Sequence, residues 1–290
     1  MATPTATKPR SSPPAAVKSL AEFGIAKAGK KLPSRLVLIG VEGIGKTSFA
    51  AFAPEPLIVQ SRGESGLETL IDAGQLAPTD HLDNELAGWQ DAMELVESIA
   101  AAEAFDYKTL VFDTLNGIEA LLSEYVLNNS FQGDRKDFEN FGTGSRVAAP
   151  MWTQFLSTLD RIRSKHSVGI IGLCHTRVRN FRNPEGADFD RYEADMSRPV
   201  WGVTSKWADI VLFYNYHTEV LQAKSDRGDV TKRGKGAGGT IRVLYTQRTA
   251  AYDAKNRHGL PEEITAGNSP EEAWNNFRAA MTVARNGKDK

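Results

Sequence analysis

One stretch of eight residues constrains this chain more than any other. Residues 40–47 are Gly-Val-Glu-Gly-Ile-Gly-Lys-Thr, a complete G-x-x-x-x-G-K-T phosphate-binding loop. The apolar run 35–39 before it predicts a buried strand, and residues 48–52 after it predict the start of a helix. A strand, a glycine-rich turn and a helix N-terminus direct successive backbone N–H groups at one point, which suits a polyphosphate. The sequence therefore predicts a nucleoside triphosphate site.

Individual residues of this loop have separate expected roles. The Lys46 ammonium is expected to reach the β- and γ-phosphates, and the Thr47 hydroxyl to hold Mg²⁺. The residues expected to contact the nucleotide are Gly40, Glu42, Gly43, Ile44, Gly45, Lys46, Thr47 and Ser48. Because the chain has no Asn-Lys-x-Asp motif for guanine, ATP with Mg²⁺ is the expected cofactor.

The rest of the chain predicts an α/β fold. Further strands are expected at 56–60, 109–113, 168–174, 210–216 and 240–245, and helices at 85–102, 115–127, 147–165 and from 269 onward. Strands that alternate with helices indicate a mostly parallel sheet flanked by helices. The polar stretch 175–206 has no clear period and predicts a long loop. A Gly/Lys-rich segment between the last two strands predicts a hairpin.

Composition predicts three regions. They are a disordered basic segment (1–34), a P-loop ATPase domain (35–265), and a C-terminal helix and tail (266–290). Residues 1–35 carry seven Lys and Arg against one acid, and residues 217–260 carry nine against four. Such basic appendages suit an anionic polymer, but they are equally typical of solvated lysines in flexible segments.

Several classes of protein and site are disfavoured. No apolar run approaches the ~18 residues of a membrane span, and the N-terminus has no signal core, so we expect a cytoplasmic protein without a membrane partner. The single cysteine, Cys174, excludes a disulfide within the chain, and the five histidines show no ligand spacing for zinc.

Three polar residues outside the loop are candidates for hydrolysis. Asp113 ends an apolar strand and is expected to hold Mg²⁺ through water; capping of the next helix is the alternative. Glu64 follows the strand at 56–60 and is our candidate general base, with Glu68 and Glu42 as competitors. His175 ends another strand, where its side chain can sense the γ-phosphate or serve only as a structural hydrogen-bonding group.

Over about residues 36–264, the chain resembles the RecA-like, AAA-type nucleotide-binding proteins of bacteriophages, including the Sak-type single-strand annealing ATPases. The loop at 40–47 is similar to the RecA loop even to its glutamate, although Val41 stands where proline is usual. Asp113, Glu64 and His175 match the Walker B acid, the catalytic glutamate and the sensor. The resemblance implies a RecA-like core with a C-terminal hairpin and helix, a homo-oligomeric ring or filament, and ATP-dependent binding and annealing of single-stranded DNA.

The resemblance also implies contacts between subunits and with DNA. In the segment 1–34, Phe23-Gly24-Ile25-Ala26 resembles the Phe-x-x-Ala plug by which some recombinases bind the next subunit, and is a candidate oligomerisation motif. Lys255 and Arg257, and with them Arg248, match basic residues that reach a neighbour's γ-phosphate, whereas ion pairs within the subunit are the alternative. The segment 175–206 becomes a candidate single-stranded DNA contact, with three arginines around one aromatic ring. The candidate DNA contacts are Arg177, Arg179, Phe181, Arg182, Lys232, Arg233 and Lys235.

These observations predict a phage-encoded ATPase, in the host cytoplasm, for DNA annealing or recombination, with a single-strand binding protein as a further partner. Two other functions stay open. One is a P-loop switch that acts on a protein, such as a helicase loader or packaging accessory. The other is a small-molecule kinase, because the arginines after His175 could form a lid.

Overall fold

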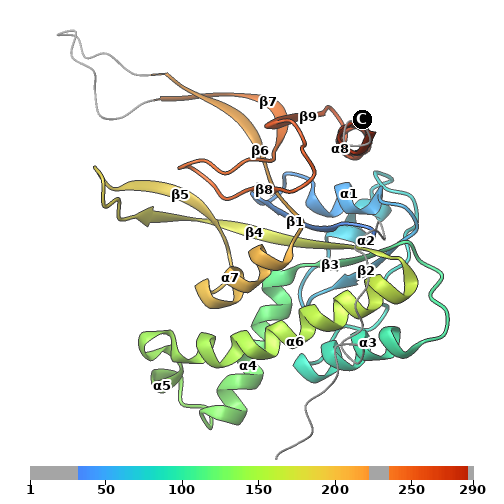
Figure 1. Ribbon diagram of the computed structural model, residues 1–290, viewed down its shortest axis with the longest axis vertical. Helices are drawn as coiled ribbons and strands as arrows, with labels where there is room; N and C mark the ends of the chain where they lie inside the picture. Colours follow the sequence, from blue (N-terminus) through green and yellow to red (C-terminus); the bar gives the residue numbers. More distant parts are fainter. Residues whose placement is uncertain (1–31, 222–234, 287–290) are drawn as a thin grey trace, which may run out of the picture. The chain divides into compact units, whose positions relative to one another are not determined.

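A mixed β-sheet is the framework of the molecule (Figure 1). The structure is a computed structural model that describes residues 32–221 and 235–286. Within these residues the strands pair in the order β2-β3-β4-β1-β6-β7-β9, with β5 beside β4 and β8 beside β6. The strands are β1 (Arg35–Gly40), β2 (Pro56–Gln60), β3 (Thr109–Asp113), β4 (Gly169–Phe181), β5 (Phe189–Ala194), β6 (Ile210–Leu221), β7 (Lys235–Tyr245), β8 (Lys255–Asn256) and β9 (Glu263–Gly267).

Five neighbouring strands, β2, β3, β4, β1 and β6, run parallel, which confirms the predicted sheet. Their carboxyl ends therefore share one edge, where ligands of open α/β sheets bind. The register places Gly40 between His175 of β4 and Tyr214 of β6. It places Gln60 beside Asp113. Strand β4 thus separates the phosphate-loop strand from the strand that ends in Asp113.

Helices cover both faces of the sheet (Figure 1). Alternate residues of β1 enter different cores: Val37 and Ile39 pack in the core with α3, α4 and α6, whereas Leu36 and Leu38 pack in the core with α1 and α8. The helices are α1 (Lys46–Ala51), α2 (Gly66–Asp72), α3 (Trp89–Ala101), α4 (Leu115–Ser130), α5 (Arg135–Glu139), the 3-10 helix η2 (Asn140–Gly142), α6 (Thr143–His166), α7 (Arg198–Trp207) and α8 (Pro270–Asn286). The four long helices predicted from periodicity correspond to α3, α4, α6 and α8.

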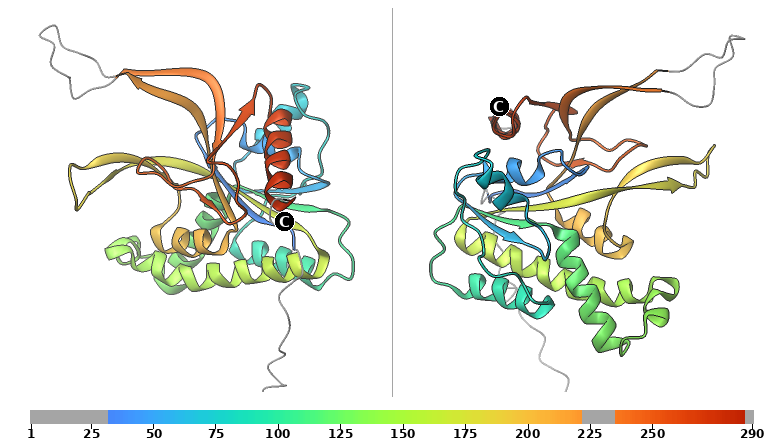
Figure 2. Two further views of the ribbon diagram at one scale, coloured as in Figure 1. Left: turned by 45° about the horizontal axis from the view of Figure 1, so that its top comes forward. Right: turned by 180° about the vertical axis from the view of Figure 1, so that it is seen from behind.

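Two strands continue beyond the sheet as hairpins that extend from the same side of it (Figure 2). Strand β4 pairs with β5 from Thr176 opposite Ala194 to Phe181 opposite Phe189, and we call this hairpin the β4–β5 arm. The predicted long loop at 175–206 is therefore wrong, because the segment forms this arm and then α7. Its charged residues pair across the strands, so it lacks the apolar alternation that signals a strand.

Other predictions have mixed outcomes. The predicted hairpin is confirmed by the pairing of β6 with β7, although its tip at 222–234 lies outside the described residues. Strands β5, β8 and β9 and helices α2, α5 and α7 were not predicted. The Phe23–Ala26 motif and the predicted disorder of the first residues also lie outside the described part of the chain. Among the described helices, none is both long and apolar enough for a membrane span.

Candidate nucleotide-binding site

The phosphate loop has a backbone that glycine makes possible. Gly43 and Gly45 have φ angles of 69° and 103°, in the left-handed region that other residues rarely adopt. A Cβ atom on either would meet nothing within 4 Å, so the backbone conformation rather than a lack of space requires glycine at both positions. A Cβ on Gly40 would instead lie 2.7 Å from the Tyr214 carbonyl oxygen, since β1 and β6 approach closely there. The backbone therefore forms a nest for an anion.

The side chains of the loop divide into two groups. Ile44 and Ser48 are buried, so any contact of these residues with a nucleotide would come from the backbone. Glu42 is exposed at the tip of the loop, and its charge acts on Lys46 less than those of Asp113 and Glu64 do. The geometry does not favour Glu42 as the general base.

Lys46 is 6% exposed, and its ammonium points back into the loop. Nζ donates to the carbonyl oxygens of Gly40 and Val41, both at 3.1 Å, and lies 3.3 Å from His175 Nδ1. Burial lowers the pKa of Lys46, and the negative charge of Asp113 opposes this change. A phosphate would offer this buried cation stronger acceptors than two neutral carbonyls do.

Thr47 and Asp113 form the oxygen pair expected for Mg²⁺. The Thr47 hydroxyl donates to Asp113 Oδ2 at 2.6 Å. Asp113 is 2% exposed, and burial raises its pKa to about 6, against the lowering effect of the Thr47 hydrogen bond. A hydroxyl and a carboxylate side by side at the phosphate loop fit Mg²⁺, which binds oxygen ligands and needs few from the protein.

Glu64 and His175 complete a line of ionisable groups. His175 Nε2 lies 3.3 Å from Glu64 Oε1, while the other ring nitrogen faces Lys46. The competing Glu68 accepts a hydrogen bond from Gln60 Nε2 at 3.1 Å instead. The structure thus brings together Lys46, Thr47, Glu64, Asp113 and His175 from four elements, although sequence separates them widely.

Sequence reasoning missed the residues that hold this cluster in place. The Asn116 side-chain oxygen accepts from the His175 backbone N–H at 3.0 Å. The Ser61 hydroxyl accepts from the Thr114 N–H at 3.1 Å, and Thr114 caps α4 by accepting from Gly117 N. The capping threonine after Asp113 was a usable signal, whereas nothing in the sequence pairs Asn116 with a strand 59 residues away.

Lys255 and Arg257 lie at the opposite edge of the sheet. Lys255 is paired with Val211 near the amino end of β6, and its Nζ donates to the carbonyls of Ser205 (2.6 Å), Ala208 (2.7 Å) and Lys206 (3.1 Å). Arg257 Nη1 lies 3.7 Å from Asp209. Arg248, the third candidate, lies 3.3 Å from Asp253 through its Nε. Within one subunit these residues do not reach the phosphate loop, so their trans role stays a prediction.

The β4–β5 arm holds most of the described candidate DNA contacts. Arg177 pairs with Asp195 at 3.0 Å, and Arg179 Nε lies 3.9 Å from Glu193. Arg179 shares a face of β4 with Phe181 by strand alternation, and Arg182 follows the end of that strand. The guanidinium described over the Phe181 ring is that of Arg191, at 5.7 Å, which the sequence did not predict. Lys232 and Arg233 lie outside the described residues, and Lys235 begins β7.

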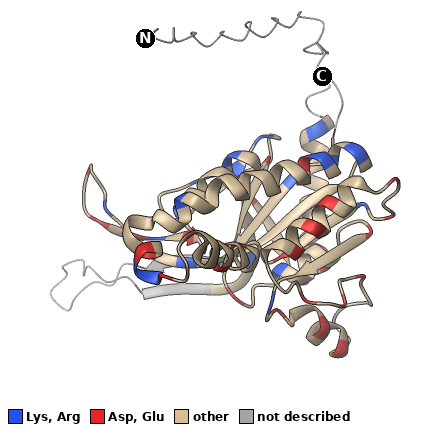
Figure 3. Ribbon diagram, turned by 90° about the horizontal axis from the view of Figure 1, so that it is seen from below, with Lys and Arg blue, Asp and Glu red and all other residues tan. Residues whose placement is uncertain are grey.

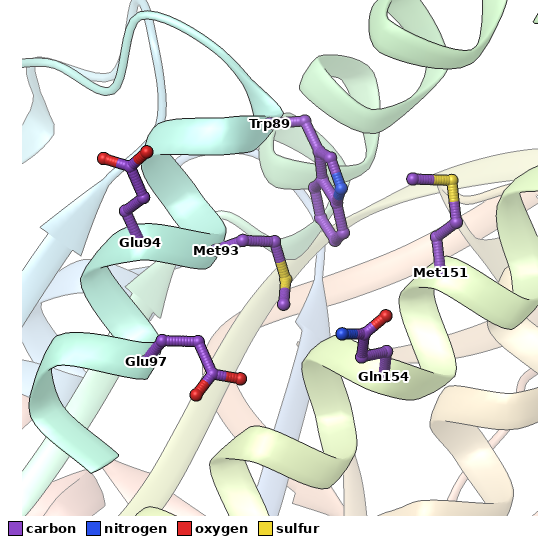
Figure 4. A pocket seen from close by; sticks show the side chains of 6 residues that line it. All are labelled: Trp89, Met93, Glu94, Glu97, Met151 and Gln154. Carbon is purple, nitrogen blue, oxygen red and sulfur yellow. The ribbon is translucent and has the colours of Figure 1, made fainter. Parts of the chain in front are cut away.

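A separate cavity of about 300 Å³ opens between α3 and α6 (Figure 4). It lies on the face of the sheet away from α1, and its lining combines an apolar floor with acidic side chains. The lining residues are Trp89, Met93, Glu94, Glu97, Met151 and Gln154. None of the predicted site residues lies there.

Fold and site together define a P-loop nucleotide-binding protein. A family model described as an AAA domain matches residues 32–258, and the chain belongs to this family. No curated protein matches the chain. Among solved structures, the chain is similar to the RadB recombinase, with 11% identity, a TM-score of 0.43, and coverage of 83% of this chain and 90% of that one. The predicted α/β class, a mostly parallel sheet flanked by helices, is confirmed, and the family match supports an AAA-type nucleotide-binding protein, whereas the RecA-like and Sak-type assignments stay predictions.

Proposed function

We propose that this chain is a Mg²⁺-dependent ATPase whose nucleotide state sets the position of the β4–β5 arm. The observation that carries the proposal is the place of His175. Its ring contacts both Lys46 and Glu64, and its backbone lies in the strand that continues into the arm. A change in the Lys46 contacts on phosphate binding would therefore act directly on β4.

The described side chains divide the work of hydrolysis. Lys46 exchanges its carbonyl acceptors for phosphate oxygens, and Thr47 with Asp113 holds Mg²⁺, which supplies charge stabilisation when bound. Glu64 orients the attacking water and takes its proton, because its carboxylate lies 3.3 Å from His175 Nε2, whereas that of Asp113 is bonded to Thr47. His175 keeps Glu64 beside the loop and reports its state to the arm.

For the arm we propose binding of single-stranded DNA, as part of annealing or recombination by a phage-encoded protein. At the arm's end Phe181 and Phe189 form an aromatic pair with ring centroids 5.2 Å apart, and Arg182 is exposed beside them. Aromatic rings stack on any base, and an arginine neutralises a phosphate, so this combination suits sequence-tolerant binding of a single strand.

A second candidate, a switch that acts on a protein partner, is favoured by the charges of the arm. Arg177 and Arg179 face Asp195 and Glu193, which leaves less net positive charge than a DNA groove usually has. In the view of Figure 3, basic and acidic positions are interspersed along the ribbon rather than gathered on one face. A half-buried aromatic pair suits a protein as well as a base.

The deciding experiment measures ATP hydrolysis with and without single-stranded DNA, with Lys46→Ala as the blank. Stimulation that Arg182→Ala removes, but Arg278→Ala on exposed α8 does not, supports the DNA function. Hydrolysis that DNA does not change, together with no salt-sensitive DNA binding, overturns it in favour of a protein partner. An activity no higher than that of the Lys46→Ala blank under all conditions overturns the ATPase itself.

We also propose that the protein works as a homo-oligomer in which Lys255 and Arg257 contact the neighbour's nucleotide. Their position supports this, because they lie at the amino edge of the sheet, opposite the edge that carries their own phosphate loop. Mixing Arg257→Ala with Lys46→Ala subunits tests it. In a trans arrangement the Lys46→Ala subunit supplies the missing arginine, so the mixture hydrolyses ATP faster than the sum of its parts. An activity equal to that sum contradicts the trans role.

A further inference from the structure

The catalytic groups lie on only one side of the phosphate-loop strand. Asp113 ends β3, His175 lies in β4, and Glu64 follows β2, and all three strands are on the same side of β1. A nucleotide whose γ-phosphate meets these groups directs its other end away from them. On the opposite side of β1 lies β6, hydrogen bonded to β1 up to Tyr214 beside Gly40. We therefore expect the base of the nucleotide to lie at the carboxyl end of β6.

An aromatic ring and a guanidinium meet there. Tyr216 of β6 is the register partner of Arg242 of β7, so their side chains share one face of the sheet. The Arg242 guanidinium lies over the Tyr216 ring at 5.9 Å. Tyr216 is partly buried against the same apolar core that Val41 of the phosphate loop packs on. The pair is thus continuous with the loop through packed side chains.

Two buried polar atoms beside this pair have no partner within the described residues. They are Arg242 Nε and the Tyr214 hydroxyl. Tyr214 is fully buried, and burial raises its pKa to about 12, so the phenol is a neutral donor at physiological pH. Buried donors without acceptors are rare and costly, and two at neighbouring positions indicate a polar partner that the chain itself does not supply.

We propose that Tyr216 and Arg242 form the base subsite of the nucleotide site, with a purine as its ligand. The ring of Tyr216 packs against the face of the purine, and a guanidinium N–H of Arg242 donates to purine N7. Both adenine and guanine carry N7, whereas cytosine and uracil do not. The subsite therefore favours purine over pyrimidine triphosphates. This inference rests on the proposed ATPase function, since it assigns the base end of the same nucleotide.

The test separates base binding from phosphate binding. Equilibrium affinities for ATP, CTP and tripolyphosphate, each with Mg²⁺, are measured on the full chain and its variants. Tyr216→Val is expected to weaken ATP binding about 10-fold, because the base loses the ring on which it stacks, and to leave tripolyphosphate binding within about twofold. Arg242→Gln is expected to act in the same direction. Tyr216→Phe retains the ring and should retain the affinity.

Controls keep the two proposals distinguishable. Arg278→Gln, at an exposed arginine of α8 outside the pair, should leave all three affinities unchanged. Equal loss of ATP and tripolyphosphate binding in Tyr216→Val overturns the subsite, because a base contact cannot act on a ligand without a base. A wild-type protein that binds tripolyphosphate as tightly as ATP also overturns the subsite but not the phosphate site. A wild-type protein that binds neither ligand overturns both.

Discussion

The two halves of strand β4 show how differently this molecule stabilises its parts. Residues 170–174 are buried in the parallel sheet, and the strand then leads to the catalytic cluster. Beyond Thr176 the same strand is half-buried or exposed, and cross-strand pairs such as Arg177 with Glu193 hold it in the β4–β5 arm. Burial makes the first half rigid. The second half has few buried apolar contacts, and segments of this kind separate from the rest of a protein at a low cost in free energy. A single strand thus joins a fixed site to a responsive arm.

The largest expected effect comes from removing the proposed general base, in the catalytic cluster next to the buried half of β4. Glu64→Gln removes the base but retains the shape of the side chain, so we expect hydrolysis to fall about 10²–10⁴-fold while ATP affinity changes little. Single-turnover hydrolysis and an equilibrium ATP titration measure the two quantities separately. Glu68→Gln is the matched control, because Glu68 bonds Gln60 outside the line from Lys46 to Glu64. A larger loss of hydrolysis rate in Glu68→Gln than in Glu64→Gln would identify Glu68 as the general base.

The second effect tests packing in the fixed half. A Cβ at Gly172 in β4 would lie 2.4 Å from Leu115 Cδ1, at the first residue of α4. Gly172→Ala forces that helix start to shift, which we expect to destabilise the protein by ~1–3 kcal/mol. Because α4 follows Asp113 and Thr114 directly, ATP affinity should fall as well. Urea unfolding and ATP titration measure the two changes, and an unchanged midpoint would show that α4 moves freely.

The same contrast explains what sequence could predict. The strand, loop and helix around Lys46 could be predicted from the local sequence pattern. The role of Asp113 could be predicted because it is an acid at the end of an apolar strand. The arm could not be predicted in this way, because Arg177 and Arg179 have ionic partners in or directly after β5 that no periodicity reveals. The hydrogen bonds of Asn116 to His175 and of Lys255 to the end of α7 could not be predicted either, because these residues are far apart in the sequence and meet only through the tertiary fold.

A third, smaller effect lies at the junction of the two regions. Both carboxylate oxygens of Glu119 in α4 accept from the Ser197 N–H at the start of α7, at 3.1 and 3.2 Å. Burial raises the pKa of Glu119, with the Ser197 hydrogen bonds opposing. The folded state thus binds more protons than the unfolded state above the ordinary glutamate pKa, and this group makes the protein less stable as pH rises through its raised pKa.

Glu119→Gln removes that charge, so the variant should gain stability relative to wild type as pH rises, and the gain should vanish at low pH. Melting temperatures between about pH 4 and 8 measure the difference. Glu97→Gln is the control of opposite sign, because hydrogen bonding to Thr158, with Arg161 adding to it, lowers the pKa of Glu97. Its loss of stability should appear above the ordinary glutamate pKa and disappear below it. Parallel pH profiles for the two variants would contradict both assignments.

The smallest effect has the opposite sign to that of Gly172→Ala and concerns the helix after the arm. Gly202 lies inside α7, and a Cβ there would meet nothing within 4 Å. Gly202→Ala should therefore stabilise the protein by ~0.5–1 kcal/mol, through the entropy that glycine loses in a helix. If α7 transmits the movement of the arm to the catalytic cluster, the stiffer helix should also reduce the stimulation of hydrolysis by the activating partner. Basal hydrolysis should be unchanged. Greater stability with full stimulation would show that α7 only anchors the arm, and that the signal travels along β4 alone.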